Sequence, residues 1–525
     1  MSILAYVILG LYCFTLLYVT VYCVMQIKLL YHYRRGIAGE MPPTKTPPIR
    51  KMALVEEGAA TWEGGAITDD VGEVIESEEL PFVTIQLPIF NERYVVERLI
   101  DNVIQFDYPK DKFEIHVLDD STDDTVEITR KKVEEYKAKG FQIEQITRTD
   151  RKGYKAGALK EGMQFAKGEF IAIFDADFLP KPDFLLKTMP WFRDPNVGVV
   201  QTRWEHINED YSLITRLQAM QLNVHFRVEQ VGRMNGNYLL QFNGTAGVWR
   251  RQTIDEAGGW EADTLTEDLD LSIRAQLKGW KIRFLENVGS PAELPVEMNS
   301  LKSQQFRWMK GGAETAKKML PTVWRSDMGL GKKIQATIHL LSSTVFVFVF
   351  AMGVFSVPLL FLFSGLMEDG ISKDFFAYFL VGLMSIIAVY YAANVNPNES
   401  GGFSVRKILK FIFLFPLFLA LSMGLSLHNT IAVLEGYRGK KSPFVRTPKF
   451  NIKSIRDKLN KTSYLNHKIS WTTILEGVFA LYFLVAVLGA IYLQNMIFIA
   501  FHLMLFLGYG AIFYYSIRNM QLRTS

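Results

Sequence analysis

Two aspartates separated by one residue, Asp175 and Asp177, follow a short apolar run at residues 170–174. Such a run is typical of a strand buried on both faces of a parallel sheet. Ligands of these sheets bind at the carboxyl ends of the strands. Two carboxylates there repel each other unless a cation lies between them, and their hard oxygen atoms favour Mg²⁺ or Mn²⁺ shared with substrate phosphates. The residues predict a metal site, although an acidic, solvated turn after a strand fits them too.

Other polar residues follow predicted strands in the same way. Glu92 lies in a turn that could hydrogen-bond a nucleotide, and Asp119 and Asp120 end a second apolar run. Lys155 belongs to the glycine-containing basic segment 151–159, where glycines allow close approach of the backbone and the ammonium offers a charge to a diphosphate. The alternative for that segment is a solvated basic loop. We expect these residues to contact a nucleotide or its diphosphate.

A third acidic motif, Thr266-Glu267-Asp268, precedes a helix-like run at residues 269–278. Threonine and acids also favour helix starts, so Glu267 fits a capping arrangement equally well. Asp268 becomes a candidate general base if it faces the same cleft as the first aspartate pair, because a carboxylate not needed for metal can accept a proton.

Gln304, Arg307 and Trp308 are spaced to lie on one face of a helix. The amide can bind sugar hydroxyls, the guanidinium can clamp a diphosphate, and the indole offers a flat apolar face to a sugar ring. The alternative is an interfacial helix at residues 303–324 whose Trp and Arg anchor it to lipid headgroups. Membrane anchoring alone gives the glutamine no role.

The elements that must position these groups alternate between strands and helices from residue 81 to about 297. This alternation predicts a mostly parallel sheet covered by helices. We expect five strands, at residues 83–87, 113–118, 141–146, 170–174 and 197–201. We expect helices at residues 94–105, 123–139 and 154–166.

Composition excludes several classes of protein. The net charge is +4 and no stretch resembles a nucleic-acid footprint, so nucleic acid is not an expected partner. The two cysteines, Cys13 and Cys23, both lie in the first apolar segment, which excludes a disulfide framework and a cysteine-based metal site. No Gly-x-Gly-x-x-Gly motif follows the first strand, which disfavours a dinucleotide-dependent dehydrogenase.

The N-terminal part predicts a membrane anchor. Residues 1–27 contain an uncharged apolar stretch long enough to span a bilayer, and it lacks the features of a cleaved signal peptide. Basic residues follow it, so the positive-inside rule places the N-terminus outside and the next domain in the cytoplasm. Residues 28–80, rich in proline and glycine, are expected to be a linker.

The C-terminal part predicts a helical membrane region at residues 336–525, after interfacial helices at 301–335. Residues 406–434 are apolar, but a span there would place the basic loop that follows outside, against the positive-inside rule. We therefore expect an interfacial helix at 406–434, a cytoplasmic loop at 436–470 and the C-terminus inside. The other four expected spans are residues 338–363, 375–393, 471–493 and 496–517, and six spans in all is the alternative.

Taken together, the ordered motifs resemble those of inverting glycosyltransferases of family 2, of the cellulose synthase and hyaluronan synthase type. The set comprises Asp119-Asp120, Asp175-x-Asp177, Thr266-Glu267-Asp268 and Gln304-x-x-Arg307-Trp308. The longer strings at residues 151–159, 242–250 and 256–260 look most like plant cellulose synthase-like A and C enzymes. The resemblance implies an α/β cytoplasmic domain of the GT-A type at residues 81–300 beside an α-helical transmembrane bundle.

The resemblance also implies roles for individual residues. Asp268 would be the catalytic base, and Asp175 and Asp177 would hold the metal. Contacts to the nucleotide sugar would come from Glu92, Asp119, Asp120, Lys155, Asp175 and Arg307. Contacts to the acceptor would come from Asn243, Thr245, Glu267, Gln304 and Trp308.

Processive members of this type have a gating loop of the form Phe-x-Val-Thr-x-Lys. Here Phe444, Thr447 and Lys449 match it, whereas Arg446 stands where the family has valine. The resemblance therefore implies a loop that closes over the donor. It lies directly after the expected interfacial helix, on the side that the charge distribution also assigns to the cytoplasm.

The expected function is metal-dependent transfer of a hexose from UDP-glucose or GDP-mannose to a growing β-linked glycan, coupled to export. A single transfer to a ceramide or diacylglycerol acceptor is the alternative, and a catalytically inactive scaffold is a third. The expected cofactor is Mg²⁺ or Mn²⁺, and the expected partners are a nucleotide sugar, a glycan or lipid acceptor and the lipid bilayer. The membrane would be the plasma membrane in a bacterium or the Golgi membrane in a eukaryote.

Overall fold

The computed structural model describes residues 3–36, 67–68, 74–75, 80–370, 380–395, 404–442, 446–452, 457 and 470–521. The described strands are β1 (Ile67–Thr68), β2 (Val74–Ile75), β3 (Val83–Ile89), β4 (Phe113–Asp119), β5 (Ile143–Thr147), β6 (Phe170–Ile173), β7 (Val197–His206), β8 (Gly247–Arg250) and β9 (Lys281–Ala292).

The α-helices are α1 (Ile3–Arg35), α2 (Val96–Val103), α3 (Thr125–Ala138), α4 (Tyr154–Phe165), α5 (Phe184–Thr188), α6 (Leu213–Asn223), α7 (Gln230–Asn235), α8 (Arg251–Glu256), α9 (Glu267–Leu277), α10 (Met298–Arg325), α11 (Leu330–Leu340), α12 (Val345–Glu368), α13 (Leu380–Asn394), α14 (Val405–Gly424), α15 (Ser426–Arg438), α16 (Trp471–Tyr492) and α17 (Ile499–Gln521). Four 3₁₀ turns are η3 (Lys110–Lys112), η4 (Met189–Arg193), η5 (Glu209–Tyr211) and η7 (Ser342–Thr344), and η6 (Val224–Glu229) is a π-helical turn.

Seven strands form one sheet in the order β5-β4-β3-β6-β8-β7-β9, and β1 pairs with β2 separately. In the large sheet β8 runs antiparallel to both neighbours and every other pairing is parallel. The predicted mostly parallel sheet is therefore confirmed. The register aligns the carboxyl ends of three strands, because Ile89 pairs with Asp119 and Gln86 with Ile173.

The two faces of the sheet are covered by different helices. Along β6, Phe170 and Ala172 belong to one buried cluster and Ile171 and Ile173 to the other, as expected for side chains that alternate across a strand. Buried residues of α2, α3 and α5 join the first cluster, and those of α4, α8 and α9 join the second. All four residues of β6 are buried, which explains why its sequence is apolar throughout.

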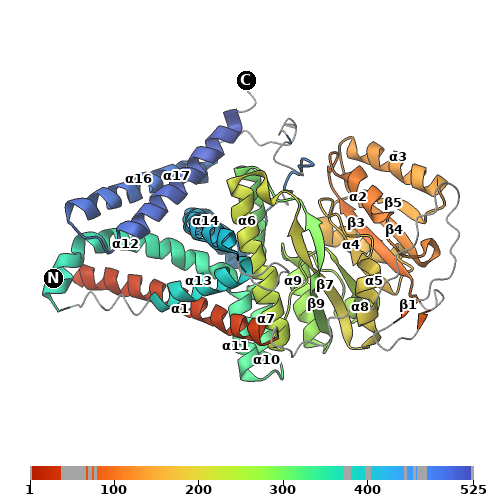
Figure 1. Ribbon diagram of the computed structural model, residues 1–525, viewed down its shortest axis with the longest axis horizontal. Helices are drawn as coiled ribbons and strands as arrows, with labels where there is room; N and C mark the ends of the chain where they lie inside the picture. Colours follow the sequence, from red (N-terminus) through yellow and green to blue (C-terminus); the bar gives the residue numbers. More distant parts are fainter. Residues whose placement is uncertain are drawn as a thin grey trace.

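The sheet and the apolar helices share a continuous core. The second cluster extends from the sheet to Tyr33 of α1, Tyr390 of α13 and Phe415 of α14. Figure 1 shows the sheet at the right, α1, α12, α16 and α17 at the left, and α6 and α7 between them. The carboxylate motifs at the sheet edge are thus tied through packed side chains to the helical region.

Five of the described helical segments are long and apolar enough to cross a membrane: Ile3–Arg35, Ser342–Glu368, Val405–Gly424, Trp471–Tyr492 and Ile499–Arg518. This set differs from the expected one in one member. Leu380–Asn394, which overlaps the expected span 375–393 and ends one residue after it, is a shorter apolar helix, and residues 375–379 of that span lie outside the described part of the chain. The first helix continues to Arg35, past the expected end at residue 27.

The helix α14 lies crosswise to its apolar neighbours. Figure 1 shows it nearly end-on, whereas α12, α16 and α17 run along the long axis of the view. That orientation supports the expected interfacial position, but α14 also meets the length and apolarity of a span. Its position relative to a bilayer stays a prediction.

Candidate active site

A cleft of about 220 Å³ opens where β3, β4 and β6 end. The structure places most of the predicted site residues around it. They are Glu92, Asp120, Lys155, Asp175, Asp177, Asn243, Glu267, Asp268, Gln304, Arg307, Trp308, Thr447 and Lys449. Asp119 and Thr245 do not line the cleft, and Phe444 lies outside the described residues.

The paired aspartates at the end of β4 face different partners. Asp119, the last residue of the strand, accepts hydrogen bonds from the Ser121 amide at 2.9 Å and from Gln145 Nε2 at 2.8 Å. Asp120 lines the cleft and forms a bidentate ion pair with Arg148, in which Arg148 Nε lies 2.9 Å from Asp120 Oδ1. Asp119 therefore supports the turn, and Asp120 is the better placed for a ligand.

Asp175, in the loop after β6, pairs with a lysine from the start of α4. Lys155 Nζ lies 2.5 Å from Asp175 Oδ1 and donates to the Gly244 carbonyl at 2.9 Å. Burial raises the pKa of Asp175, with Lys155 acting in the opposite sense. Burial alone would lower the pKa of Lys155, but the carboxylates of Asp175 and Glu267 outweigh it and raise that pKa. The ammonium is therefore charged and lines the cleft.

Asp177 receives a lysine from the segment 446–452. Lys449 Nζ lies 2.5 Å from Asp177 Oδ2 and 2.5 Å from the Glu293 carbonyl oxygen. Each carboxylate of the Asp-x-Asp motif thus already pairs with a cationic side chain. Each ammonium occupies a carboxylate oxygen that a metal ion would also use, and the remaining hard oxygen donors of the two residues suit Mg²⁺ or Mn²⁺.

Two further contacts hold the segment 446–452 across the cleft. Arg446 Nη1 lies 2.6 Å from Glu92 Oε2, and Arg307 Nη2 donates to Thr447 Oγ1 at 2.9 Å. Burial raises the pKa of Glu92 to about 7 despite the neighbouring guanidinium, and burial lowers the pKa of Arg307 to about 10. The residue that departs from the family pattern, Arg446, thus pairs with a predicted nucleotide-binding residue.

Asp268 lies in the first turn of α9, beside Glu267. Burial, followed by repulsion from the Glu267 carboxylate, raises the pKa of Asp268 to about 7. Burial also raises the pKa of Glu267. The Thr266 side chain does not cap α9 and instead lies 3.0 Å from Thr315 Oγ1 of α10. A carboxylate whose pKa lies near neutrality can accept a proton at physiological pH and still release it.

The loop before β8 closes one side of the cleft around Asp268. Thr245 is fully buried and its hydroxyl accepts a hydrogen bond from the Asp175 backbone amide at 2.8 Å, so it holds the loop after β6 and does not face the cleft. Gly244 has a φ of +79°, and a Cβ atom there would lie 3.1 Å from Asp268 Oδ2. Asn243 does line the cleft, and its backbone N–H donates to Gln201 Oε1 at 2.9 Å.

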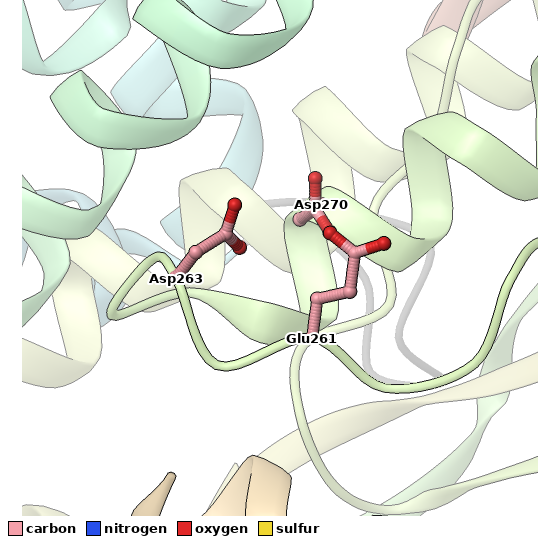
Figure 2. Close-up of side chains that lie close together, drawn as sticks. All are labelled: Glu261, Asp263 and Asp270. Atoms are coloured by element: carbon pink, nitrogen blue, oxygen red, sulfur yellow. The ribbon is translucent and has the colours of Figure 1, made fainter.

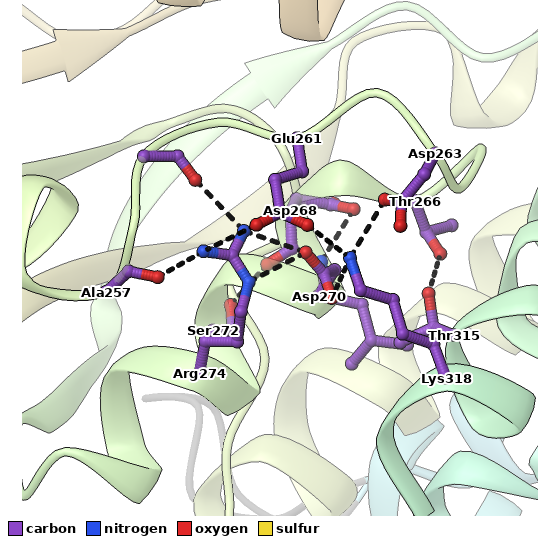
Figure 3. Close-up of polar contacts among 12 residues, drawn as sticks. Ala257, Glu261, Asp263, Thr266, Asp268, Asp270, Ser272, Arg274, Thr315 and Lys318 are labelled. Carbon is purple, nitrogen blue, oxygen red and sulfur yellow. Dashed lines mark hydrogen bonds and ion pairs between the residues drawn. The ribbon is translucent and has the colours of Figure 1, made fainter.

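A second acidic cluster lies on the far side of α9. Carboxylate oxygen atoms of Glu261, Asp263 and Asp270 lie within 4.8 Å of one another. Figure 2 shows these three side chains close together. Lys318 Nζ lies 2.6, 2.8 and 3.1 Å from these three residues, and Arg274 pairs with Asp270 at 2.7 Å (Figure 3). The cluster is thus an ion-pair network that ties α9 to α10, and it is separate from the predicted metal site.

Some residues in or beside the cleft were not predicted. Arg148 does not line the cleft but pairs with Asp120, which does; it follows the last residue of β5, and a charged residue at a strand's carboxyl end was its only sequence signal. Arg151 places its guanidinium 3.2 Å from the centre of the Phe90 ring, and both residues line the cleft. Trp204, toward the end of β7, lines the cleft too, and no local pattern marks it.

Comparison with known protein families indicates which class of protein the fold and the cleft belong to. Residues 81–311 match the family described as "Glycosyltransferase like family 2". The predicted resemblance to this family is therefore confirmed, and the sheet domain is of the GT-A type, next to helices that could cross a membrane.

Two of the curated proteins that are similar to this chain come from plants. Glucomannan 4-beta-mannosyltransferase 1 of Oryza sativa subsp. japonica is 45% identical over 274 residues, which cover 51% of this chain and 52% of that protein. Glucomannan 4-beta-mannosyltransferase 2 of Arabidopsis thaliana is 43% identical over 265 residues, which cover 50% and 49%. The chain spans about half the length of the curated relatives it matches.

One solved structure is a mannosyltransferase, PcManGT from Pyrobaculum calidifontis in complex with GDP-Man and Mn²⁺. It is 18% identical, with a TM-score of 0.45, and the match covers 71% of this chain and 98% of that one. A likeness this slight does not bear on the chemistry of the cleft.

Proposed function

We propose that this protein is an inverting hexosyltransferase that transfers mannose from GDP-mannose to the 4-hydroxyl of a β-linked glycan. The observation that carries the proposal is the cleft itself. It brings Asp268, with a pKa raised to about 7, together with a predicted metal site and two cationic side chains, Lys155 and Arg307. Mannose and the 4-β linkage come from the names of the plant relatives, and glucose is the alternative sugar.

The donor would bind with its diphosphate toward the Asp-x-Asp motif. Lys155 and Arg307 offer positive charge to the phosphate oxygens, and Asp120 and Glu92 lie on the side of β3 and β4 where the nucleotide would lie. A Mg²⁺ or Mn²⁺ ion held by Asp175 and Asp177 would supply further positive charge to the departing diphosphate.

Asp268 would accept the proton of the acceptor hydroxyl as its oxygen attacks the anomeric carbon. The new bond joins that oxygen to the carbon, the bond to the diphosphate oxygen breaks, and the proton remains on Asp268. A single displacement inverts the anomeric configuration, so an α-linked donor gives a β-glycoside.

The acceptor would enter past the α10 residues. Gln304 and Trp308 line the cleft on the same helical face as Arg307, and α10 packs on α15 and α17. An indole at this place suits an apolar sugar face. This arrangement supports extension of a glycan toward the helical region, although processive transfer and export stay predictions.

A label-incorporation assay tests the proposal. The full-length chain in lipid nanodiscs is given labelled GDP-mannose or UDP-glucose, with Mn²⁺ or Mg²⁺, and Asp268→Asn is the inactive variant. Asp255→Asn, at an exposed position of α8, is the matched control. We expect polymer that a β-1,4-mannanase digests, made by wild type and control but not by Asp268→Asn.

Two results would count against the proposal. Label that partitions into organic solvent would indicate a lipid acceptor. Equal incorporation by wild type and Asp268→Asn would show that another group takes the proton.

A further inference from the structure

The π-helical turn η6 carries two residues that the proposed chemistry does not use, His225 and Glu229. It lies between α6 and α7 and contacts α1, α13 and β7. The two residues are four apart on this turn, and His225 Nδ1 lies 3.0 Å from Glu229 Oε2. Single π turns inside helices often occur at functional sites.

The other ring nitrogen of His225 points to the cleft. His225 Nε2 lies 2.8 Å from Oδ1 of Asn243, which lines the cleft next to Gly244 and Asp268. A chain of contacts thus leads from the half-buried Glu229 carboxylate through the imidazole ring to the side chain of Asn243.

The orientation of the Asn243 amide follows from its other contact. Asn243 Nδ2 donates to the Gln241 carbonyl oxygen at 3.4 Å. A flipped amide would bring Oδ1 against that carbonyl oxygen, and two acceptors repel each other. Oδ1 therefore faces His225 and accepts a hydrogen bond from it.

Both ring nitrogens of His225 face oxygen atoms of a neighbouring side chain. Burial alone would raise the pKa of Glu229, but Arg233 and His225 outweigh it and lower that pKa, so its carboxylate is ionised and can only accept. The ring is therefore held on both sides, between Glu229 and Asn243, and its orientation is fixed.

Charged and titratable groups from the neighbouring elements surround His225 and Glu229. From the packed elements, Arg233 of α7, His339 of α11, Tyr22 of α1 and Tyr390 of α13 interact electrostatically with this pair. Arg233 Nη2 donates to Glu229 Oε2 at 3.1 Å. Burial lowers the pKa of His339 well below its usual value, so His339 is neutral.

We propose that His225, held in place by Glu229, is a positioning residue that fixes the Asn243 side-chain amide for a hydroxyl group of the acceptor sugar. The inference rests on the proposed transferase function. A hydrogen bond at Oδ1 holds the Nδ2–H groups in one orientation, and sugar hydroxyl oxygens are the acceptors that they fit. The backbone of Asn243 is held separately by Gln201, so loss of the ring changes the side chain first.

The test is a steady-state analysis of His225→Gln in nanodiscs with GDP-mannose and β-1,4-mannotetraose as acceptor. The KM for the acceptor should rise about tenfold, the effect expected from losing one hydrogen bond. The kcat and the KM for GDP-mannose should change by less than about twofold, because the group acts only on the acceptor. His32→Gln is the matched control, since His32 packs on Tyr238 and does not line the cleft.

Glu229→Gln gives a second readout that a merely structural role would not move. It preserves the side chain's shape but weakens the hydrogen bond that holds the ring of His225. The acceptor KM of this variant should rise, by less than in His225→Gln, while kcat and the KM for GDP-mannose stay within about twofold of the wild-type values.

An unchanged acceptor KM in His225→Gln, with wild type active, would overturn the inference alone. A Glu229→Gln variant in which kcat falls as much as the acceptor KM rises would also overturn it. Absence of transfer by the wild-type protein from either GDP-mannose or UDP-glucose would instead refute the proposed function.

Discussion

Replacing Lys449 by methionine should tighten binding of Mn²⁺ to the donor-free protein. Lys449 Nζ lies 2.5 Å from Asp177 Oδ2, so the ammonium uses an oxygen that a metal ion would also need. Methionine fills similar space but carries no charge. Removing the positive charge beside the Asp177 carboxylate favours binding of Mn²⁺ there, whether or not the segment 446–452 moves.

The size of the effect follows from the burial of the pair. The Lys449 side chain is 8% exposed and that of Asp177 is 15% exposed, so solvent screens the interaction little. A hydrogen bond to a charged group contributes about 1.5–3 kcal/mol. Mn²⁺ must displace it, so the variant should bind Mn²⁺ about tenfold to a hundredfold more tightly.

The assay is titration of the full-length protein in nanodiscs with Mn²⁺, with free Mn²⁺ measured by electron paramagnetic resonance. Lys441→Met, at an exposed position before the same loop, is the matched control and should bind as wild type does. Unchanged or weaker Mn²⁺ binding by Lys449→Met would refute the reasoning that the lysine and the metal share Asp177.

Two further predictions concern the base. The Glu267→Gln substitution removes a carboxylate that repels Asp268, so the pKa of Asp268 should fall below its value of about 7. The acid limb of the plot of kcat against pH should then move to lower pH. An unshifted limb would show that burial alone sets this pKa. Gly244→Ala should lower kcat about tenfold or more, because the added Cβ would lie 3.1 Å from Asp268 Oδ2. Gly140→Ala, at a φ of +81° with nothing within 4 Å, introduces similar backbone strain without the crowding, and an equal loss in both variants would contradict the explanation.

The sheet was predictable where the strands are apolar and buried. The five expected strands correspond to β3 to β7, because apolar runs between helical patterns mark strands covered on both faces. The strands β8 and β9 were missed. β8 has only four residues, and the pairing of β9 with β7 is interrupted by register shifts, so neither shows a regular period.

The site was predictable where residues follow strands. Asp175 and Asp120 lie at carboxyl ends that a parallel sheet brings to one edge, so their strand positions located them. Which of two adjacent residues faces the cleft was harder to predict, since Asp119 contacts Gln145 while Asp120 lines the cleft. The partner of Arg446 is far away in the sequence, and no local pattern could reveal that contact.

The central claim is inverting transfer with Asp268 as the base. The most direct measurement is nuclear magnetic resonance of the first product formed from GDP-mannose and β-1,4-mannotetraose by the protein in nanodiscs. The account predicts a new β-anomeric signal whose rate of appearance rises with pH through about 7 and is lost in Asp268→Asn. A new α-anomeric signal would contradict it, because retention requires a second displacement that a single base does not provide.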